Sequence, residues 1–326
     1  MSKKGRILSG MRASGRLHIG HLSVLKNWIR LQDEYDCFYF VADLHALTTA
    51  YDDPGAIKEN TLAMVADWLA AGLDPQKSVL FVQSDIPAHA ELHLIFSMFT
   101  PLSWLERVPT YKDQVQQFKE QGKDIMTYGF LGYPLLQAAD ILMYRADAVP
   151  VGEDQLPHVE LCREVARRFN HLYGKVFPEP RGELARVATL PGVDGRKMSK
   201  SYANDISLTA SREEINERVN AMITDPARIR KNDPGHPEVC VVHKYHDYYS
   251  PELIGGIEED CRAGRVGCVA CKRSLTEKID RLLAPVREKR EQITDRYVTE
   301  VIAEGARKAR VEAAATMALV RAALKI

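Results

Sequence analysis

The chain has 326 residues, of which 44 are lysine or arginine and 44 are aspartate or glutamate, so its formal net charge is zero. Hydrophobic residues make up 45% and charged residues 27%, which is typical of a globular protein and excludes a collagenous or largely disordered chain. No uninterrupted apolar stretch reaches the roughly 20 residues of a membrane span, and no apolar signal core follows the N-terminus. We expect a cytoplasmic protein of about two domains with no membrane partner.

The two ends of the chain differ in charge. Residues 261–326 contain 15 lysines and arginines but only 8 acidic residues, and the rest of the chain is acidic to the same extent. A basic end on an acidic body suggests a polyanionic partner such as a nucleic acid. The alternative is that this end is an ordinary helical surface rich in lysine and arginine.

The predicted elements of the first half alternate between strands and helices. An α/β fold with a Rossmann-like, doubly wound parallel sheet follows from this alternation, with a helical insertion at about residues 100–150. Ligands bind beyond the carboxyl ends of the strands in such sheets. Strand-like runs occur at residues 6–9, 37–41, 79–82, 148–151 and 187–190, and helical patterns at 22–31, 54–71, 89–99, 133–144 and 157–169.

The alternation stops at about residue 205. Helical patterns then occupy residues 209–223, 274–297 and 297–324. We expect an α/β domain over 1–205 and an α-helical domain over 206–326, with an irregular segment at 225–272.

A first motif follows the first strand, where residues 14–21 read Ser-Gly-Arg-Leu-His-Ile-Gly-His. A helix start offers backbone N–H groups and the positive end of the helix dipole, and both suit phosphate. His18 and His21 lie three residues apart, so they share one side of the helix and could donate to triphosphate oxygens. Gly20 has no Cβ, so a flat base could approach the backbone. Taken alone, the motif could also be a surface helix start with two incidental histidines.

A second motif, Lys197-Met198-Ser199-Lys200-Ser201, follows a glycine-bearing loop after the last predicted strand. Its two lysines could neutralise a pyrophosphate. The two motifs, in this order and at the two ends of an α/β region, resemble the HIGH and KMSKS elements of the class I aminoacyl-tRNA synthetases.

Two further stretches narrow this resemblance. Residues 133–142 read Tyr-Pro-Leu-Leu-Gln-Ala-Ala-Asp-Ile-Leu, and residues 149–155 read Val-Pro-Val-Gly-Glu-Asp-Gln. They are similar to the tryptophanyl-tRNA synthetase family, densely from about residue 6 to 205 and more loosely beyond. The resemblance implies ATP- and Mg²⁺-dependent attachment of L-tryptophan to tRNA(Trp) through a tryptophanyl-adenylate. It also implies catalysis in 1–205, anticodon binding in 206–326, and a homodimer formed through the insertion.

The resemblance implies roles for individual residues. Asp140 would accept the indole N–H, and a carboxylate on an apolar helix is costly to bury without a donor. A structural salt bridge is the alternative. The other residues implied for tryptophan are Tyr133, Gln137, Gln155 and His45. Those implied for ATP are Arg12, Ala13, Ser14, Gly20, His21, Gly152, Glu153, Asp154, Val187, Lys197, Met198, Ser199, Lys200 and Ser201. The catalytic groups would be His18, His21, Lys197 and Lys200, with Lys112 near the carboxylate or phosphate.

Two positions depart from the family pattern, because Ala13 stands where proline is common and Arg12 where several relatives carry glutamine. Three other functions stay open. A tyrosine-specific synthetase shares the architecture, a nucleotidyltransferase shares the first motif, and a paralogue could bind RNA or protein without catalysis.

The six cysteines fall into two groups. Cys37 and Cys162 lie in apolar patterns and should be core residues. Cys240, Cys261, Cys268 and Cys271 have the spacing C-x20-C-x6-C-x2-C, which in a cytosolic chain favours a metal site over disulfides. Four-thiolate zinc sites usually pair two short knuckles and only one is present here, whereas iron–sulfur clusters accept a remote ligand.

A resemblance to tryptophanyl enzymes of some thermophilic bacteria implies a [4Fe–4S] cluster at these four cysteines, with zinc or free thiols as alternatives. The segment 261–273 around them is basic and contains no acidic residue. It could dock an RNA backbone or an anticodon base, or the metal could only brace an irregular segment.

Overall fold

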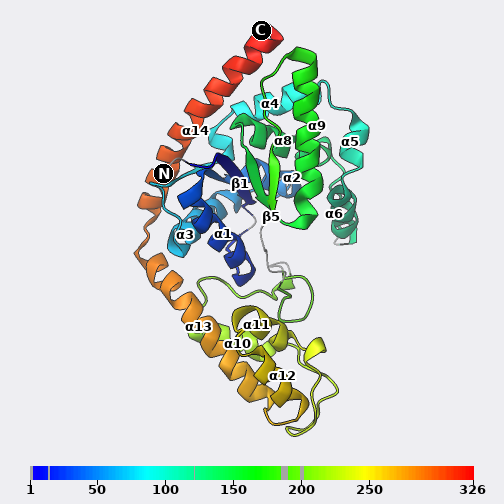
Figure 1. Ribbon diagram of the computed structural model, residues 1–326, viewed down its shortest axis with the longest axis vertical. Helices are drawn as coiled ribbons and strands as arrows, with labels where there is room; N and C mark the ends of the chain where they lie inside the picture. Colours follow the sequence, from blue (N-terminus) through cyan, green and yellow to red (C-terminus); the bar gives the residue numbers. More distant parts are fainter. Residues whose placement is uncertain (1–2, 14, 121, 185–189, 199–201) are drawn as a thin grey trace.

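The computed structural model describes residues 3–13, 15–120, 122–184, 190–198 and 202–326. In this part of the chain, five parallel strands form one sheet in the order β3-β2-β1-β4-β5, with helices on both faces (Figure 1). This order confirms the predicted Rossmann-like, doubly wound α/β fold. The strands are β1 (Arg6–Arg12), β2 (Asp36–Ala42), β3 (Ser78–Val82), β4 (Ala148–Val151) and β5 (Arg181–Leu184).

Helices follow every strand of the sheet except β5, where the next described helix comes after residue 211. Those among the strands are α1 (Leu22–Glu34), α2 (Asp43–Ala50), α3 (Ile57–Ala71), α4 (Ala88–Ser97), α5 (Leu102–Glu106), α6 (Pro109–Glu120), α7 (Tyr128–Leu131), α8 (Tyr133–Met143) and α9 (Leu156–Tyr173). The later ones are α10 (Arg212–Ala221), α11 (Val241–Tyr249), α12 (Ile254–Arg262), α13 (Cys268–Gln292) and α14 (Asp295–Leu324). Short 3-10 turns are η1 (Ile19–His21), η2 (Gln83–Asp85), η3 (Glu153–Gln155) and η5 (Pro237–Val239).

The central strands are covered on both faces, so alternate residues enter two separate cores, whereas the edge strand β5 is partly exposed. Ile7 and Tyr39 belong to a core that also contains apolar side chains of α1, α3 and α13. Leu8 and Phe40 belong to the opposite core, which is filled from α4, α8 and α9. Both sequence-predicted core cysteines, Cys37 and Cys162, are fully buried, which confirms that prediction.

The last helix, α14, returns to the α/β part of the molecule. It packs against β3, α3, α4 and α8 and runs along the upper body in Figure 1, while α10 to α13 form a lower helical body. Residues 206–326 therefore do not all lie in the lower body, and the division into domains at residue 205 stays a prediction. None of the helices in the described chain is both long and apolar enough to span a membrane.

One sequence prediction needs correction, and one strand was missed. The segment 225–272 is not irregular, because it contains α11, α12 and the start of α13. The side chains that α11 buries, including Val241, Tyr245 and Tyr249, have helical spacing, and packing of this face compensates for a polar sequence. The fifth described strand, β5, was not predicted from the sequence; of the strand predicted at 187–190, residues 187–189 lie outside the described residues and Leu190 is in no strand.

Candidate active site

A cavity of about 390 Å³ opens at the carboxyl ends of β1, β2 and β4, where a doubly wound sheet binds its ligands. Arg12, the last residue of β1, and Gly152, directly after β4, stand on its rim. The structure brings many of the sequence-predicted residues together around this cavity, namely Arg12, His21, His45, Tyr133, Gln137, Asp140, Gly152 and Gln155.

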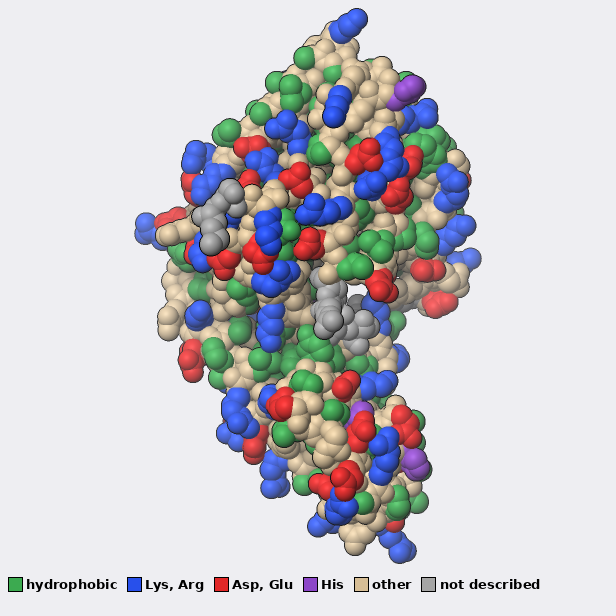
Figure 2. All heavy atoms as spheres, viewed as in Figure 1, with side chains coloured by type: hydrophobic (Ala, Val, Ile, Leu, Met, Phe, Trp, Pro, Cys, Tyr) green, Lys and Arg blue, Asp and Glu red, His purple; other side chains and the backbone are tan. Residues whose placement is uncertain are grey.

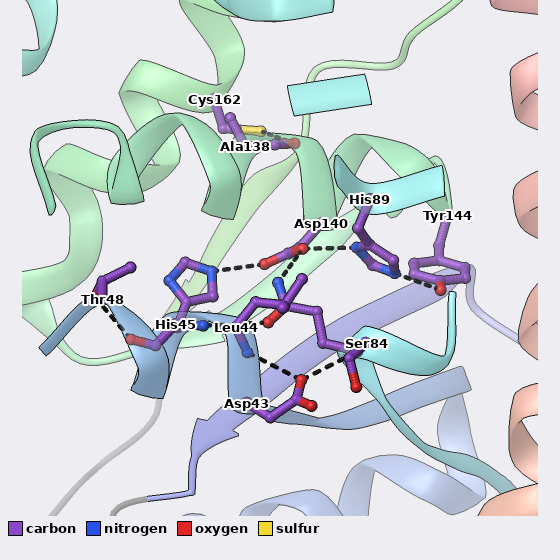
Figure 3. Close-up of polar contacts among 11 residues, drawn as sticks. Asp43, Leu44, His45, Thr48, Ser84, His89, Ala138, Asp140, Tyr144 and Cys162 are labelled. Carbon is purple, nitrogen blue, oxygen red and sulfur yellow. Dashed lines mark hydrogen bonds and ion pairs between the residues drawn. The ribbon is translucent and has the colours of Figure 1, made fainter. Parts of the chain in front are cut away.

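A buried carboxylate, Asp140 of α8, lines the cavity, and its polar contacts are drawn in Figure 3. Its Oδ2 is 2.8 Å from Nε2 of His45, and its Oδ1 is 2.6 Å from Nδ1 of His89. Gln83 donates from Nε2 to the same Oδ1 at 2.7 Å. Among the described residues, Asp140 therefore pairs with two imidazoles and an amide and with no lysine or arginine.

Asp140 is held in its ionised form by these partners. Burial by itself raises the pKa of Asp140, but the hydrogen bonds from His45 and His89 outweigh it, and the net pKa lies below the ordinary value. The cavity thus presents a negatively charged acceptor in apolar surroundings.

A second hydrogen-bonded chain fixes Tyr133 at the side of the cavity. The Tyr133 hydroxyl is 2.8 Å from Oγ1 of Thr110, which is in turn 2.7 Å from Nε2 of the buried His158. Burial, followed by the nearby His45, lowers the pKa of His158 to about 4, so this imidazole is neutral at neutral pH. Tyr133, Gln137 and Asp140 share one face of α8 because they follow the helical repeat.

The first motif forms η1 and the start of α1. The His18 backbone N–H donates to Nδ1 of His21, and the two rings lie with their centroids 3.8 Å apart. Because Nδ1 of His21 accepts, a neutral His21 carries its proton on Nε2 and can donate from there into the cavity that it lines. Ala13, just before the motif, is buried.

The two motifs lie next to each other in space. A Cβ on Gly20 would come within 3.6 Å of Sδ of Met198, which is buried. The Ile19 N–H donates to the Ile206 carbonyl at 2.8 Å, just after the second motif. Lys197 is exposed, and its carbonyl accepts from Nδ2 of Asn204.

The remaining predicted residues are placed as follows. Glu153 and Asp154 are exposed in η3 beside the cavity, and Asp154 accepts from Nε2 of Gln155 at 2.8 Å. Lys112 is exposed on α6 and is not among the residues that line the cavity. Ser14, Val187, Ser199, Lys200 and Ser201 lie outside the described residues.

Sequence reasoning missed several residues at the Asp140 end of the site. Gln83 follows β3 directly, so its place at the carboxyl end of a strand was a usable signal. His89 begins a helix whose other inward side chains, such as Leu92 and Phe96, are apolar. Thr110, Tyr144 and His158 carried no local signal, because their partners are distant in sequence.

Comparison with known proteins agrees with this geometry. A family model described as tRNA synthetases class I (W and Y) matches residues 1–284. A tryptophan–tRNA ligase of Thermotoga maritima is 54% identical over 98% of this chain and 99% of that protein. One of Aquifex aeolicus is 46% identical over 98% of this chain and 100% of that protein. This chain belongs to the class I tRNA synthetases of the tryptophan and tyrosine type.

A solved structure extends the comparison to the whole fold of this class I synthetase. Tryptophanyl-tRNA synthetase from Campylobacter jejuni, crystallised with ADP and tryptophan, matches with a TM-score of 0.86 and 33% identity. The match covers 98% of this chain and 100% of that one.

The four clustered cysteines of this synthetase lie at helix ends in the lower body. Cys240 caps α11, Cys261 lies in the last turn of α12, and Cys268 and Cys271 lie in the first turn of α13. Nη1 of Arg228 is 3.8 Å from Sγ of Cys261 and 4.0 Å from Sγ of Cys268. Among the residues that the structure describes, no group of three or more His, Cys, Asp or Glu side chains is arranged to hold a metal ion.

The lower body of the synthetase carries both signs of charge. Basic and acidic side chains are interspersed over the face drawn in Figure 2. Arg262 pairs with Glu258 at 3.1 Å, and Arg265 pairs with Glu259 and Asp260 at 2.6 Å. Part of the basic segment 261–273 is therefore neutralised by the acidic residues that precede it.

Proposed function

We propose that this chain is a tryptophan–tRNA ligase. The observation that carries the proposal is a cavity that joins the first phosphate motif to a buried, ionised acceptor, Asp140. An indole is large and apolar and has a single N–H donor, so it suits an apolar slot ending on one carboxylate. The names of the similar proteins support the same substrate.

The proposed reaction has two steps. The tryptophan carboxylate attacks the α-phosphate of ATP, the bond to the β-phosphate breaks, and pyrophosphate leaves. The terminal ribose hydroxyl of tRNA, in this class first the 2′ hydroxyl, then attacks the aminoacyl carbonyl and AMP leaves. Both steps depend on positioning and on neutralising phosphate charge, and bound Mg²⁺ would supply part of that neutralisation.

Individual residues have proposed roles in these steps. His18, His21, Lys197 and Lys200 stabilise the departing phosphates. Tyr133 and Gln155 hold the α-amino group, while His45 and Gln137 line the slot beside Asp140. The other proposed ATP contacts are Arg12, Ala13, Ser14, Gly20, Gly152, Glu153, Asp154, Val187, Met198, Ser199 and Ser201.

Amino-acid-dependent ATP–pyrophosphate exchange tests the substrate. We expect exchange with L-tryptophan and none above background with L-tyrosine or L-phenylalanine, because neither offers a ring N–H. Exchange with tyrosine alone would replace the proposal by a tyrosine-specific ligase.

Charging of tRNA tests the second step. The purified chain should attach tryptophan to a tRNA(Trp) transcript. Adenylate formation without charging would indicate a nucleotidyltransferase, and RNA binding without either step would indicate a non-catalytic paralogue.

We further propose that Cys240, Cys261, Cys268 and Cys271 hold a [4Fe–4S] cluster that braces the junction of α11, α12 and α13. Two observations support a thiolate site. The four thiols lie within electrostatic reach of one another, since the pKa of Cys271 is raised to about 12 by burial and then by the other three. Arg228 also sets a cation beside two of the sulfurs. Four thiolates with one remote member suit such a cluster.

Anaerobic purification tests the cluster. We expect a brown protein with broad violet absorption and iron and sulfide in equal amounts. Cys268→Ser should lose the colour, whereas Cys162→Ala, at a buried cysteine of the α/β core, should keep it. A colourless protein with stoichiometric zinc, or with no metal, would refute the cluster.

The resemblance also leads us to propose that the lower helical body binds the anticodon. Arg273 follows Cys271 and Lys272, is exposed and forms no ion pair with another described residue, so it is a suitable charge for phosphate. Arg273→Glu should weaken tRNA binding, more strongly at low salt, and leave pyrophosphate exchange intact. If this variant bound tRNA with the same affinity as wild type, the proposal that the lower body binds the anticodon would be contradicted.

A homodimer is the last part of the proposal. Leu94 of α4, Met98 directly after α4 and Leu102 of α5 are exposed although they are large and apolar. They lie just before and at the start of the predicted insertion at about residues 100–150, and exposed apolar patches mark protein interfaces. We expect a dimer by light scattering and a monomer for Met98→Lys; a wild-type monomer would contradict it. We also propose a cytoplasmic location, because charged tRNA is used there in translation.

A further inference from the structure

We propose that Gln83, His89 and Tyr144 are positioning residues that leave Asp140 with one acceptor position toward the amino-acid cavity, so that the site demands a ring N–H. This inference rests on the proposed tryptophan specificity and names the residues that set it.

The two oxygens of Asp140 have different surroundings. Oδ1 accepts from Nε2 of Gln83 at 2.7 Å and from Nδ1 of His89 at 2.6 Å. Oδ2 is paired only with Nε2 of His45, at 2.8 Å, among the described residues. Figure 3 shows His89 and His45 on opposite sides of the carboxylate.

The acceptor capacity of a carboxylate determines how many positions on Asp140 remain free for a ligand. An ionised carboxylate has about two acceptor positions on each oxygen. Oδ1 is saturated by Gln83 and His89, whereas Oδ2 has one position beyond the bond to His45. Because His45 lines the cavity and neither Gln83 nor His89 does, the remaining position is on the cavity side.

Tyr144 fixes the tautomer of His89. A carboxylate has no proton to donate, so Nδ1 of His89 must carry the hydrogen of that bond. In the neutral ring Nε2 is then an acceptor, and it lies 2.8 Å from the hydroxyl of Tyr144. His89 and Tyr144 are fully buried, so no solvent competes for either group.

Gln83 is fixed in the same way. Its Oε1 accepts from the backbone N–H of His45 at 3.4 Å, so the amide nitrogen is turned toward Asp140. Gln83 is also fully buried, and it joins the end of β3 to the start of α2.

This arrangement selects an amino acid whose ring offers one hydrogen-bond donor to Asp140. A ring N–H fills the second acceptor position of Oδ2, whereas a ring without a donor leaves that position of a buried carboxylate unfilled. Loss of His89 or Tyr144 would loosen this demand, because Asp140 could turn or take a proton. Binding of the rest of the amino acid would be unaffected.

The experiment compares L-tryptophan with β-(3-benzothienyl)-L-alanine, in which sulfur replaces the ring N–H, in ATP–pyrophosphate exchange. The quantity measured is kcat/KM for tryptophan divided by kcat/KM for the sulfur analogue. Hydrogen bonds to a charged group lead us to expect His89→Leu to lower this ratio about 10- to 100-fold. For Tyr144→Phe, which removes a neutral hydrogen bond, we expect about 3- to 10-fold.

Two variants separate positioning from packing. His89→Asn can place an amide N–H where Nδ1 was, so it should recover most of the ratio. Tyr39→Phe removes another buried tyrosine hydroxyl, which donates to the Trp28 carbonyl and does not line the cavity, and it should leave the ratio unchanged.

The outcomes decide between the two proposals. A ratio equal to wild type in Tyr144→Phe, and in His89→Leu if that variant folds, overturns this inference and leaves the proposed function standing. Absence of tryptophan-dependent exchange in the unaltered chain overturns both.

Discussion

Gly305 of α14 lies directly against the backbone of Leu80 in β3, and a Cβ at position 305 would overlap the Leu80 carbonyl. β3 is an edge strand of the sheet, so its outer side is a template for pairing with another chain. The helix covers that edge. Ile302, one turn before Gly305, belongs to one core, and Ala306 and the residues after it belong to the other. Close approach at Gly305 thus lets one helix cross the sheet edge and close both cores.

Replacement of Gly305 by alanine should therefore destabilise the protein. Alanine favours a helix by about 1 kcal/mol over glycine, but a backbone overlap in a packed interface costs about 1–3 kcal/mol or more. We expect a net loss of about 2 kcal/mol in the free energy of unfolding, measured by urea denaturation.

A matched control exists on α12. A Cβ on Gly255 meets nothing within 4 Å, so Gly255→Ala should be neutral or slightly stabilising. If Gly305→Ala were as stable as Gly255→Ala, close packing at the sheet edge would not be what Gly305 provides.

The order of elements in the α/β half could be predicted because strand and helix patterns there are strong and local. Apolar runs such as 37–41 and 79–82 gave β2 and β3 within one or two residues. Asp140 stood out because a lone carboxylate on an apolar helix needs a partner. The sequence did not identify that partner, since His45 and His89 lie 95 and 51 residues away along the chain.

The path of the C-terminal half was harder to predict. The polar composition of 225–272 concealed two helices. One is α11, whose buried face packs against α13, and the other is α12, which buries no side chain fully and packs against α11. The return of α14 to β3 depends on Gly305. It could not be predicted, because a glycine inside a helical pattern does not identify the element that packs against it.

Asp140→Asn is the direct test of the proposed indole acceptor. The substitution removes the negative charge that would accept the ring N–H. It also places an amide NH₂ opposite the N–H donors of His45 or His89. We expect the KM for tryptophan to rise about 10- to 100-fold while the KM for ATP is unchanged. Asp33→Asn, at an exposed ion pair with Lys77, is the control for loss of one charge and should leave both constants unchanged. Equal tryptophan KM values in Asp140→Asn and wild type would remove Asp140 from substrate recognition.

Thr110→Val should weaken the structure around Tyr133. The hydroxyl of Thr110 bonds both Tyr133 and His158, so the isosteric valine leaves two polar groups without this partner. We expect a loss of about 1–3 kcal/mol in the free energy of unfolding, together with a higher KM for tryptophan. Thr276 is the control, because its buried Oγ1 has no hydrogen-bond partner among the described residues, and Thr276→Val should not destabilise. A similar stability for both variants would contradict a structural role of the Thr110 bridge.

His158 should make the folded state sensitive to acid. Its pKa is lowered by burial to about 4 in the folded chain, against an ordinary value of 6.5. Between these values the unfolded chain binds a proton that the folded chain does not, so stability falls as the pH drops from about 6.5 toward 4. Above pH 6.5 the imidazole is neutral in both states and contributes no pH dependence. One pKa unit corresponds to about 1.4 kcal/mol, so the loss reaches about 3 kcal/mol near pH 4.

Urea unfolding at pH 7 and pH 4.5 measures this effect. His158→Asn cannot take up the proton, so the stability difference between the two pH values should shrink by about 2 kcal/mol relative to wild type. The same substitution at His171, exposed on the same helix α9, should leave that difference unchanged and serves as the control. If His158→Asn loses as much stability between pH 7 and pH 4.5 as wild type, the acid sensitivity comes from other groups. A buried neutral imidazole at position 158 requires this loss to be smaller in the variant.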